Sequence, residues 1–233
     1  RGHQETGHVY RAMNNADAAL NAYSRAIQIN PALLASFRAQ IDILSATGRE
    51  SGTGPLRRQL ESLEALPKVL VVVMDLIAHG KLVKAEELCK GFMQKVPRHI
   101  EGMRLLADIG NRLGVLEDAE FLLESAIAFS PDSIQVRIDY IQVLRKRHKY
   151  EEALAQAKLL LAKDPKNPQF QSVFAVESMQ SGDYATALKA FDSILKIIPE
   201  DPVTLTSRGT VLKTTGQTDE AIESYRRAIK KYQ

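Results

Sequence analysis

The chain has 233 residues, of which 45% are hydrophobic, 25% charged and 6% aromatic, with 31 Lys and Arg residues against 28 Asp and Glu residues. This composition excludes an intrinsically disordered or collagen-like chain, and the net charge of +3 does not by itself indicate a nucleic-acid-binding protein. The longest apolar run, residues 69–74, is far shorter than the roughly 20 residues that cross a bilayer. We therefore expect a soluble globular protein of one or two domains, with neither nucleic acid nor membrane as a partner.

The residues that usually ligate metals or attack substrates are sparse. Cys89 is the single cysteine, so an internal disulfide or a CxxC metal knuckle cannot form. None of the five histidines pairs with another in an HxxxH or HExxH pattern. We therefore expect a protein of a reducing compartment, the cytoplasm, with no cofactor, no metal and no catalytic residue in this chain.

Internal repeats are the strongest signal in the sequence. Four prolines stand 34 residues apart, each with an alanine twelve residues before it and a turn residue seventeen before it. The prolines are Pro97, Pro131, Pro165 and Pro199, the alanines are Ala85, Ala119, Ala153 and Ala187, and the turn residues are Gly80, Gly114, His148 and Gly182. The same frame reaches Ala19, Tyr23 and Pro31 near the start and Gly216 and Ala221 near the end.

Each repeat is expected to form two helices. Residues 100–112 place apolar side chains three and four positions apart, which is typical of a helix with one buried stripe. Gly114 then turns the chain, and a second helix over residues 117–129 ends before Pro131. The methyl group of Ala119 allows the two helices to cross closely.

This pattern resembles the tetratricopeptide repeat family, whose 34-residue helix-turn-helix unit has small residues at the helix crossing and a closing proline. The resemblance implies an all-α, right-handed α-solenoid of about seven units. We expect N-terminal units in residues 1–65 and five regular units in residues 66–233. Because the chain begins with Arg1 and stops where its last proline is due, we expect one continuous solenoid truncated at the C-terminus.

The second unit departs from the pattern. Gly48 and Gly80 are 32 residues apart, and the junction 49–55 is rich in glycine. This junction lacks the Lys-Ser/Thr ending of a phosphate-binding loop, so we expect an irregular link with a new helix starting at Pro55.

The repeat register predicts a polar, mainly basic pocket in the concave groove. Its residues come from the first helices of the fourth and fifth units: Arg104, Asp108, Asn111, Arg112, Gln142, Arg145 and Lys146. Guanidinium and amide groups in this arrangement suit a protein or acidic peptide partner. The alternative is that the basic run 145–149 is a solvated helix end, where cations suit the helix dipole.

Two further sets of groove residues, in the first and third units, differ from the basic pocket. The chaperone-binding members of the family use a Lys and Asn pair in their first unit, where this sequence has Gln4 and His8. In the third unit the expected groove positions are Leu70, Met74, Ile77 and Ala78. Either an apolar ligand packs on them or the irregular second unit folds over them.

A narrower resemblance is to the repeat region that precedes the catalytic domain of bacterial sulfotransferases. It is carried by short phrases, of which Leu212-Lys213-Thr214-Thr215-Gly216 and Arg226-Arg227-Ala228-Ile229 are the most distinctive. Others lie at residues 85–88, 104–107, 112–114, 118–120 and 164–168. Two hypotheses follow: a non-catalytic protein-interaction scaffold, or a substrate-recruiting arm linked to a sulfotransferase domain that uses phosphoadenosine phosphosulfate and lies beyond residue 233. The oligomeric state is left open.

Overall fold

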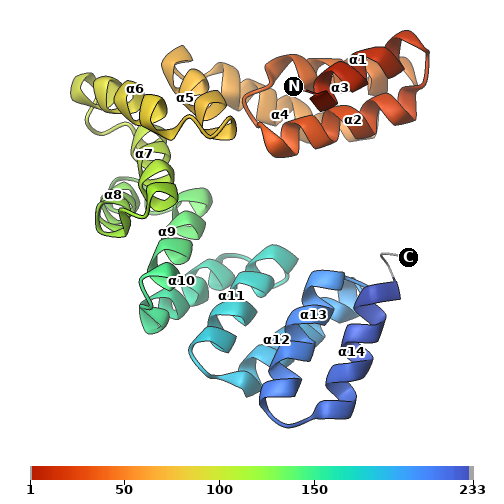
Figure 1. Cartoon of the computed structure of the whole chain (residues 1–233), viewed down its shortest axis with the longest axis vertical. Coiled ribbons are helices and arrows are strands. Elements are labelled where there is room, and N and C mark those ends of the chain that lie inside the picture. The colour runs from red at the N-terminus through yellow and green to blue at the C-terminus, as the bar shows by residue number, and fades with distance from the viewer. Residues whose placement is uncertain (1, 231–233) are drawn as a thin grey trace. The chain divides into compact units, whose positions relative to one another are not determined.

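The computed structural model describes residues 2–230, and over these residues the protein is entirely helical (Figure 1). It contains fourteen α-helices, one short 3-10 helix and no strand in that range. The helices form seven consecutive pairs, which confirms the expected all-α fold of about seven helix-turn-helix units. The chain divides into two compact units, Arg1–Val115 and Leu116–Gln233, which are described separately below.

The first unit contains seven α-helices among its described residues. They are α1 (Gly2–Ala12), α2 (Ala16–Ile29), α3 (Leu34–Ala46), α4 (Thr53–Glu64), α5 (Lys68–Ala78), α6 (Leu82–Lys95) and α7 (Ile100–Leu113). Each helix packs mainly on its neighbours in sequence, as α1 on α2 and α3 on α4 (Figure 1). This local stacking is what the 34-residue repeat predicts.

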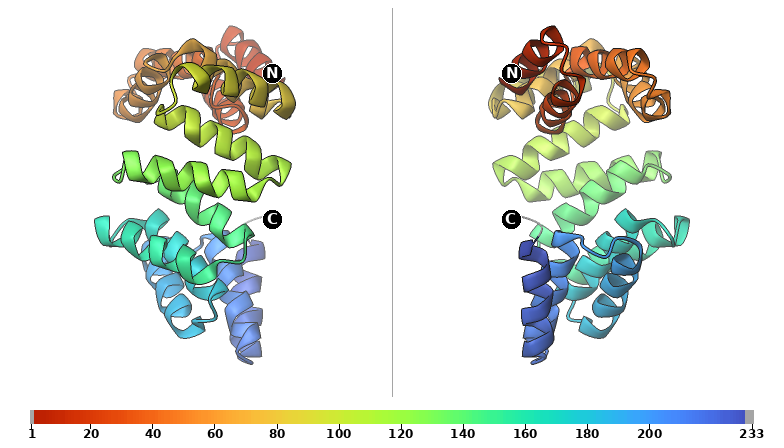
Figure 2. Two further views of the ribbon diagram at one scale, coloured as in Figure 1. Left: turned by 90° about the vertical axis from the view of Figure 1, so that its left-hand side faces the viewer. Right: turned by 90° about the vertical axis from the view of Figure 1, so that its right-hand side faces the viewer.

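The second unit likewise contains seven α-helices among its described residues. They are α8 (Leu116–Phe129), α9 (Ile134–Lys146), α10 (Tyr150–Lys163), α11 (Pro168–Gln180), α12 (Tyr184–Ile197), α13 (Pro202–Thr214) and α14 (Thr218–Lys230). Figure 2 shows α12, α13 and α14 lying side by side, each packed on the next. No helix in residues 2–230 combines the length and the apolar character that crossing a membrane requires.

The turns inside the helix pairs all contain one residue with a positive φ angle. These residues are Asn14, Gly48, Gly80, Gly114, His148, Gly182 and Gly216, with φ between 55° and 85°. Glycine adopts this left-handed conformation at little cost, and asparagine tolerates it better than other residues do. The repeat frame predicted five of these positions, and Asn14 and Gly48 complete the series.

The alanines of the repeat frame are core residues. Ala19, Ala85, Ala119, Ala153 and Ala187 are all fully buried, and Ala221 is nearly so. Their burial is what a small residue at a close helix crossing predicts.

The junction after the second unit's first helix is irregular, as expected, but its helix begins earlier than predicted. Residues Glu50–Gly52 form a 3-10 turn, and α4 starts at Thr53, not at Pro55. The buried Thr53 hydroxyl donates a hydrogen bond of 2.8 Å to the Glu50 carbonyl oxygen. This bond joins the 3-10 turn to the α-helix, so the helix starts two residues before the proline.

Of the four apolar residues predicted for the groove of the third unit, Leu70 and Ile77 are core residues. They pack with Ala85 of α6 and with Leu105 and Ile109 of α7 in one hydrophobic cluster. Met74 is half-buried against the same cluster, and Ala78 is half-buried.

Candidate functional site

The predicted groove residues of the first unit lie together on α7, where each cation meets an acidic side chain of its own helix. The Arg104 guanidinium donates two hydrogen bonds, of 2.8 and 2.6 Å, to the Glu101 carboxylate. Arg112 Nε donates a 3.0 Å bond to Asp108 Oδ1. Asn111 lies on the same helix. The positive charge of both arginines is therefore largely compensated within α7.

The predicted groove residues of the second unit lie together on α9. Gln142 and Lys146 are exposed, and Arg145 is half-buried. Arg145 Nε lies 3.2 Å from Oε1 of Glu177 on the neighbouring helix α11. Arg145 thus differs from Arg104 and Arg112, because its acidic partner comes from another helix.

Glu177 is the residue of this site that the sequence analysis missed. Its side chain is fully buried, and neither carboxylate oxygen accepts a hydrogen bond from a described residue. Burial raises the pKa of the Glu177 carboxyl above its usual value, and the positive charge of Arg145 only partly counters this effect. The positions at intervals of 34 residues from Glu177 are apolar: Ile109, Val143 and Val211. An acidic residue in this apolar series is the signal that could have identified it.

The basic run at residues 145–149 serves several contacts inside the second unit. Arg147 donates a hydrogen bond to Glu120 of α8 and pairs with Glu117 at 3.0 Å, while Lys149 Nζ donates to Glu120 at 2.7 Å. His148 takes the left-handed turn position, and its Nδ1 lies 2.7 Å from the Tyr150 hydroxyl. Arg147 and Lys149 therefore attach the α9–α10 turn to α8. These two residues of the basic run have a structural role.

Glu120 is the centre of this network. Burial by itself raises the pKa of the Glu120 carboxyl, but the hydrogen bonds and charges of Lys149 and Arg147 outweigh it and hold the pKa below its usual value. Glu120 is therefore ionised at neutral pH and holds both cations in place.

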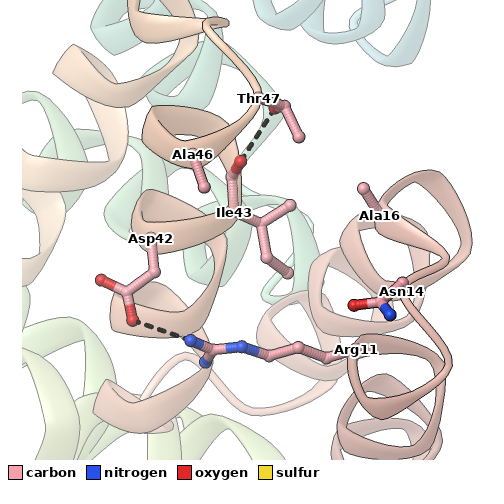
Figure 3. Close-up of a pocket in the computed structure, with 7 residues that line it drawn as sticks. All are labelled: Arg11, Asn14, Ala16, Asp42, Ile43, Ala46 and Thr47. Carbon is pink, nitrogen blue, oxygen red and sulfur yellow. Dashed lines mark hydrogen bonds and ion pairs between the residues drawn. The ribbon is translucent and has the colours of Figure 1, made fainter.

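A small cleft of about 250 Å³ opens in the first unit between the end of α1 and α3. Figure 3 shows Arg11 and Asp42 pointing toward each other across it, with Nη2 of Arg11 3.4 Å from Oδ2 of Asp42. The Asn14 side chain lies near this pair, and Ile43 and Ala46 supply an apolar wall. The cleft offers both charge signs and an amide, which suits a short polar side chain better than a large ligand.

Arg49 of the glycine-rich junction bonds to α2 and to Thr47, which lines this cleft. Arg49 Nη1 donates a 2.7 Å hydrogen bond to Asp17 of α2, and Arg49 Nε donates a 3.1 Å bond to the Thr47 hydroxyl. The Thr47 hydroxyl in turn donates a 2.8 Å bond to the Ile43 carbonyl oxygen. Arg49 thus links the junction to the first helix pair, through the hydrogen bond from Nη1 to Asp17, and to Thr47 through the bond from Nε.

A second cleft of about 480 Å³ lies between the start of α1, the end of α2 and the end of α5. Asn30, which is nearly buried, donates a 2.7 Å hydrogen bond from Nδ2 to Oδ1 of Asp75 and so joins α2 to α5. His3 and His79 lie at its rim, and His79 Nδ1 lies 2.7 Å from the Asp75 carbonyl oxygen. No group of three His, Cys, Asp or Glu side chains placed to hold a metal occurs within residues 2–230.

The remaining candidates for chemistry have structural roles. Cys89 is fully buried, its thiol donates to the Gly102 carbonyl oxygen at 3.4 Å, and burial raises its pKa to about 11. His99 caps the start of α7 by accepting a hydrogen bond from the Gly102 amide. His8 Nδ1 lies 2.8 Å from the hydroxyl of the buried Tyr23. The Cys89 thiol, whose pKa is about 11, is protonated at neutral pH and is therefore not a nucleophile.

Comparison with protein families gives two matches, both to tetratricopeptide repeats. The model of the cytochrome c-type biogenesis protein H TPR domain matches residues 90–204, and the general tetratricopeptide repeat model matches residues 3–33 and 204–230. The residues between 33 and 90 that neither model matches include the irregular second unit.

Curated relatives match over a short stretch. The chain is 31% identical over 93 residues to the probable UDP-N-acetylglucosamine--peptide N-acetylglucosaminyltransferase SPINDLY of Solanum lycopersicum, and 30% identical over 94 residues to that of Arabidopsis thaliana. Each match covers 40% of this chain and 10% of the relative, so the chain spans about a tenth of the length of these proteins. The resemblance to the repeat region of bacterial sulfotransferases gains no support from these matches.

Solved structures of MamA share the fold at low sequence identity. A crystal structure of MamA has a TM-score of 0.60 at 16% identity and covers 69% of this chain and 94% of that chain. A fragment of MamA from Desulfovibrio magneticus RS-1 has a TM-score of 0.63 at 14% identity, covering 70% and 92%. The two family models together match residues 3–33 and 90–230, and these matches, with the helical fold, show that the chain contains tetratricopeptide repeats.

Proposed function

We propose that the protein is a non-catalytic interaction scaffold, and that an acidic segment of a protein partner binds along the first helices of the repeats in its second unit. The observation that carries this proposal is the state of Arg145. Its Nε lies 3.2 Å from Oε1 of Glu177, and its side chain remains 36% exposed. The two terminal nitrogens of an arginine are a pair of donors that can bind a carboxylate in bidentate fashion.

A second cation supports this choice of partner. Lys213 on α13 stands 68 residues after Arg145, which is two repeats of 34, and it is exposed and makes no ion pair with a described residue. Met179 of α11 stands midway between them in the repeat frame. Equivalent positions of stacked repeats face the same side. The row formed by Arg145, Met179 and Lys213 therefore presents one cation on each side of an apolar residue.

The first unit is less suited to an acidic partner. Arg104 and Arg112 would have to give up Glu101 and Asp108, with which they already form charge-assisted hydrogen bonds. Of the seven residues predicted from the sequence, we therefore propose Gln142, Arg145 and Lys146 as the partner-binding residues, and we assign Arg104, Asp108, Asn111 and Arg112 a smaller part.

The experiment is a binding titration of the full chain with fluorescein-labelled hexaglutamate, hexalysine and hexaglutamine, followed by fluorescence anisotropy. We expect hexaglutamate to bind most tightly, and its affinity to fall as NaCl rises from 50 to 500 mM, because exposed charges are screened over about 8 Å at physiological salt. Equal affinities for the three peptides, or no binding of hexaglutamate at 50 mM salt, would refute the proposal.

A further inference from the structure

We infer that Glu177 is a positioning residue for the carboxylate-binding site at Arg145, and that a partner carboxylate binds there together with uptake of one proton by Glu177. This inference rests on the proposed function, since it concerns the same site. The charge of Arg145 alone would not make the affinity for an acidic partner depend on pH near neutrality, whereas titration of Glu177 would.

The geometry gives Glu177 control over the orientation of Arg145. The side chain of Glu177 is fully buried in α11, whereas the side chain of Arg145 on α9 remains 36% exposed. Nε of Arg145 lies 3.2 Å from Glu177 Oε1, so the ion pair draws this edge of the guanidinium toward the buried carboxylate. The exposed part of the Arg145 side chain is where a ligand from solvent would bind.

The surroundings of Glu177 give its charge little other support. α12 and α13 contribute apolar residues to one cluster beside α11, with Tyr184 of α12 as the titratable group at its edge. α9 and α10 contribute apolar residues to a second cluster with α11, with Tyr140 of α9 as the titratable group packed against it. The neighbouring Ser178 hydroxyl is buried and has no hydrogen-bond partner among the described residues. Arg145 is the charged group that acts on Glu177.

Binding of a carboxylate to Arg145 therefore changes the protonation of Glu177. Two carboxylates would then share one guanidinium, and the like charge raises the pKa of Glu177 beyond the increase already caused by burial. The proton comes from solvent and stays on the Glu177 carboxyl, and no covalent bond forms or breaks. The protonated carboxyl keeps an oxygen that can accept from Arg145 Nε, so the guanidinium stays in position.

The sign of the pH dependence follows from these two shifts. Below the pKa of the free protein Glu177 is protonated in both states, and above the pKa of the complex it is ionised in both, so affinity is constant in each range. Between the two values the complex binds one more proton than the free protein does. Affinity in this interval, which lies above the ordinary value of 4.5, rises as pH falls, by at most about tenfold per pH unit.

The test compares the wild-type chain with the Glu177→Gln variant, which keeps an oxygen acceptor for Arg145 but cannot titrate. Binding of fluorescein-labelled hexaglutamate is measured from pH 5.5 to 8.0, and proton uptake is measured by calorimetry at pH 6.5 in two buffers of different ionisation enthalpy. The matched control is Asp192→Asn, which removes an exposed carboxylate of the same unit that pairs with Arg208. Circular dichroism and a thermal melt check that each variant is folded.

We expect the wild type and Asp192→Asn to bind more tightly as pH falls and to take up a proton. Glu177→Gln should bind with an affinity that does not rise as pH falls, with no Glu177-dependent uptake. The same pH dependence in wild type and Glu177→Gln would overturn the inference and leave the proposed function standing. No binding of hexaglutamate to either protein at any pH would overturn both.

Discussion

Gly209 of α13 lies directly against the ring of Tyr225 of α14, so closely that a Cβ atom on Gly209 would stand 2.7 Å from Tyr225 Cε1. Gly7 of α1 has the same relationship to Tyr23 of α2, at 2.6 Å. Both pairs are sixteen residues apart, one residue in each helix of a repeat. The pairs show that side-chain size is balanced across the crossing: where the second helix supplies a tyrosine, the first supplies a glycine.

Adding a methyl group at Gly209 should destabilise the fold. The rigid ring of Tyr225 fills the space, so Gly209→Ala should lower the free energy of unfolding by about 1–3 kcal/mol, measured by urea denaturation. Gly91→Ala is the matched control, because Gly91 lies in α6 with no heavy atom within 4 Å of a Cβ position. That variant should be neutral or more stable by up to about 1 kcal/mol. A loss at Gly91 as large as that at Gly209 would show that the crossing contact is not the cause.

Alanine and asparagine should have different effects on stability at the left-handed turn positions. Gly182 has φ of 85° and open space around its Cβ position, so backbone conformation alone decides the outcome. Gly182→Ala should cost about 1 kcal/mol, and Gly182→Asn should cost less because asparagine tolerates this region. Urea denaturation of both variants provides the measurement. An alanine variant as stable as the asparagine variant would contradict this account of the repeat turns.

The Glu120 network should make stability depend on pH in the acid range. Because the folded-state pKa of Glu120 lies below its ordinary value, its contribution to stability is fully present above the unfolded-state pKa and is lost as pH falls through the folded-state pKa. Glu120→Gln should therefore destabilise the protein by about 1–3 kcal/mol at pH 7.

The same substitution should cost less at pH 3 than at pH 7, because the ionised carboxyl of the wild type is lost as pH falls through its folded-state pKa. Urea denaturation at the two pH values tests this, with Glu124→Gln as a surface control expected to stay within about 0.5 kcal/mol at both. An equal loss for Glu120→Gln at pH 3 and pH 7 would show that its charge is not what binds Arg147 and Lys149.

The repeat spacing was sufficient to predict the helix pairs, because the 34-residue period fixes the prolines, alanines and turn residues together. It failed at the start of α4, in the unit where the period drops to 32 residues, because the Thr53 hydroxyl bond joins a 3-10 turn to a helix that begins before Pro55. It also did not show that Leu70 and Ile77 are core residues. Where the 34-residue period is interrupted, local hydrogen bonds and packing determine where the helices begin and which residues are buried.

The candidate site was predicted less well, because counting cations in register does not reveal their partners. The spacings of Glu101 to Arg104 and of Asp108 to Arg112 are three and four residues, at which side chains of one helix meet, so these pairs could have been predicted. The contact between Arg145 and Glu177 joins different helices. It depends on the packing of α9 on α11, which sequence spacing alone does not specify.

The central claim is that Arg145, and not the arginines of α7, anchors an acidic partner, and the most direct test compares Arg145→Gln with Arg112→Gln. Each variant removes one positive charge, and the double variant Arg145→Gln/Glu177→Gln removes the buried carboxylate that Arg145→Gln would leave without a partner. The dissociation constant of fluorescein-labelled hexaglutamate is measured at pH 6.5 in 50 mM NaCl. We expect about a tenfold or greater loss of affinity for Arg145→Gln and for the double variant, as for a lost charge-assisted hydrogen bond, and less than about a twofold change for Arg112→Gln. Equal losses for Arg145→Gln and Arg112→Gln, or a greater loss for Arg112→Gln, would contradict the claim.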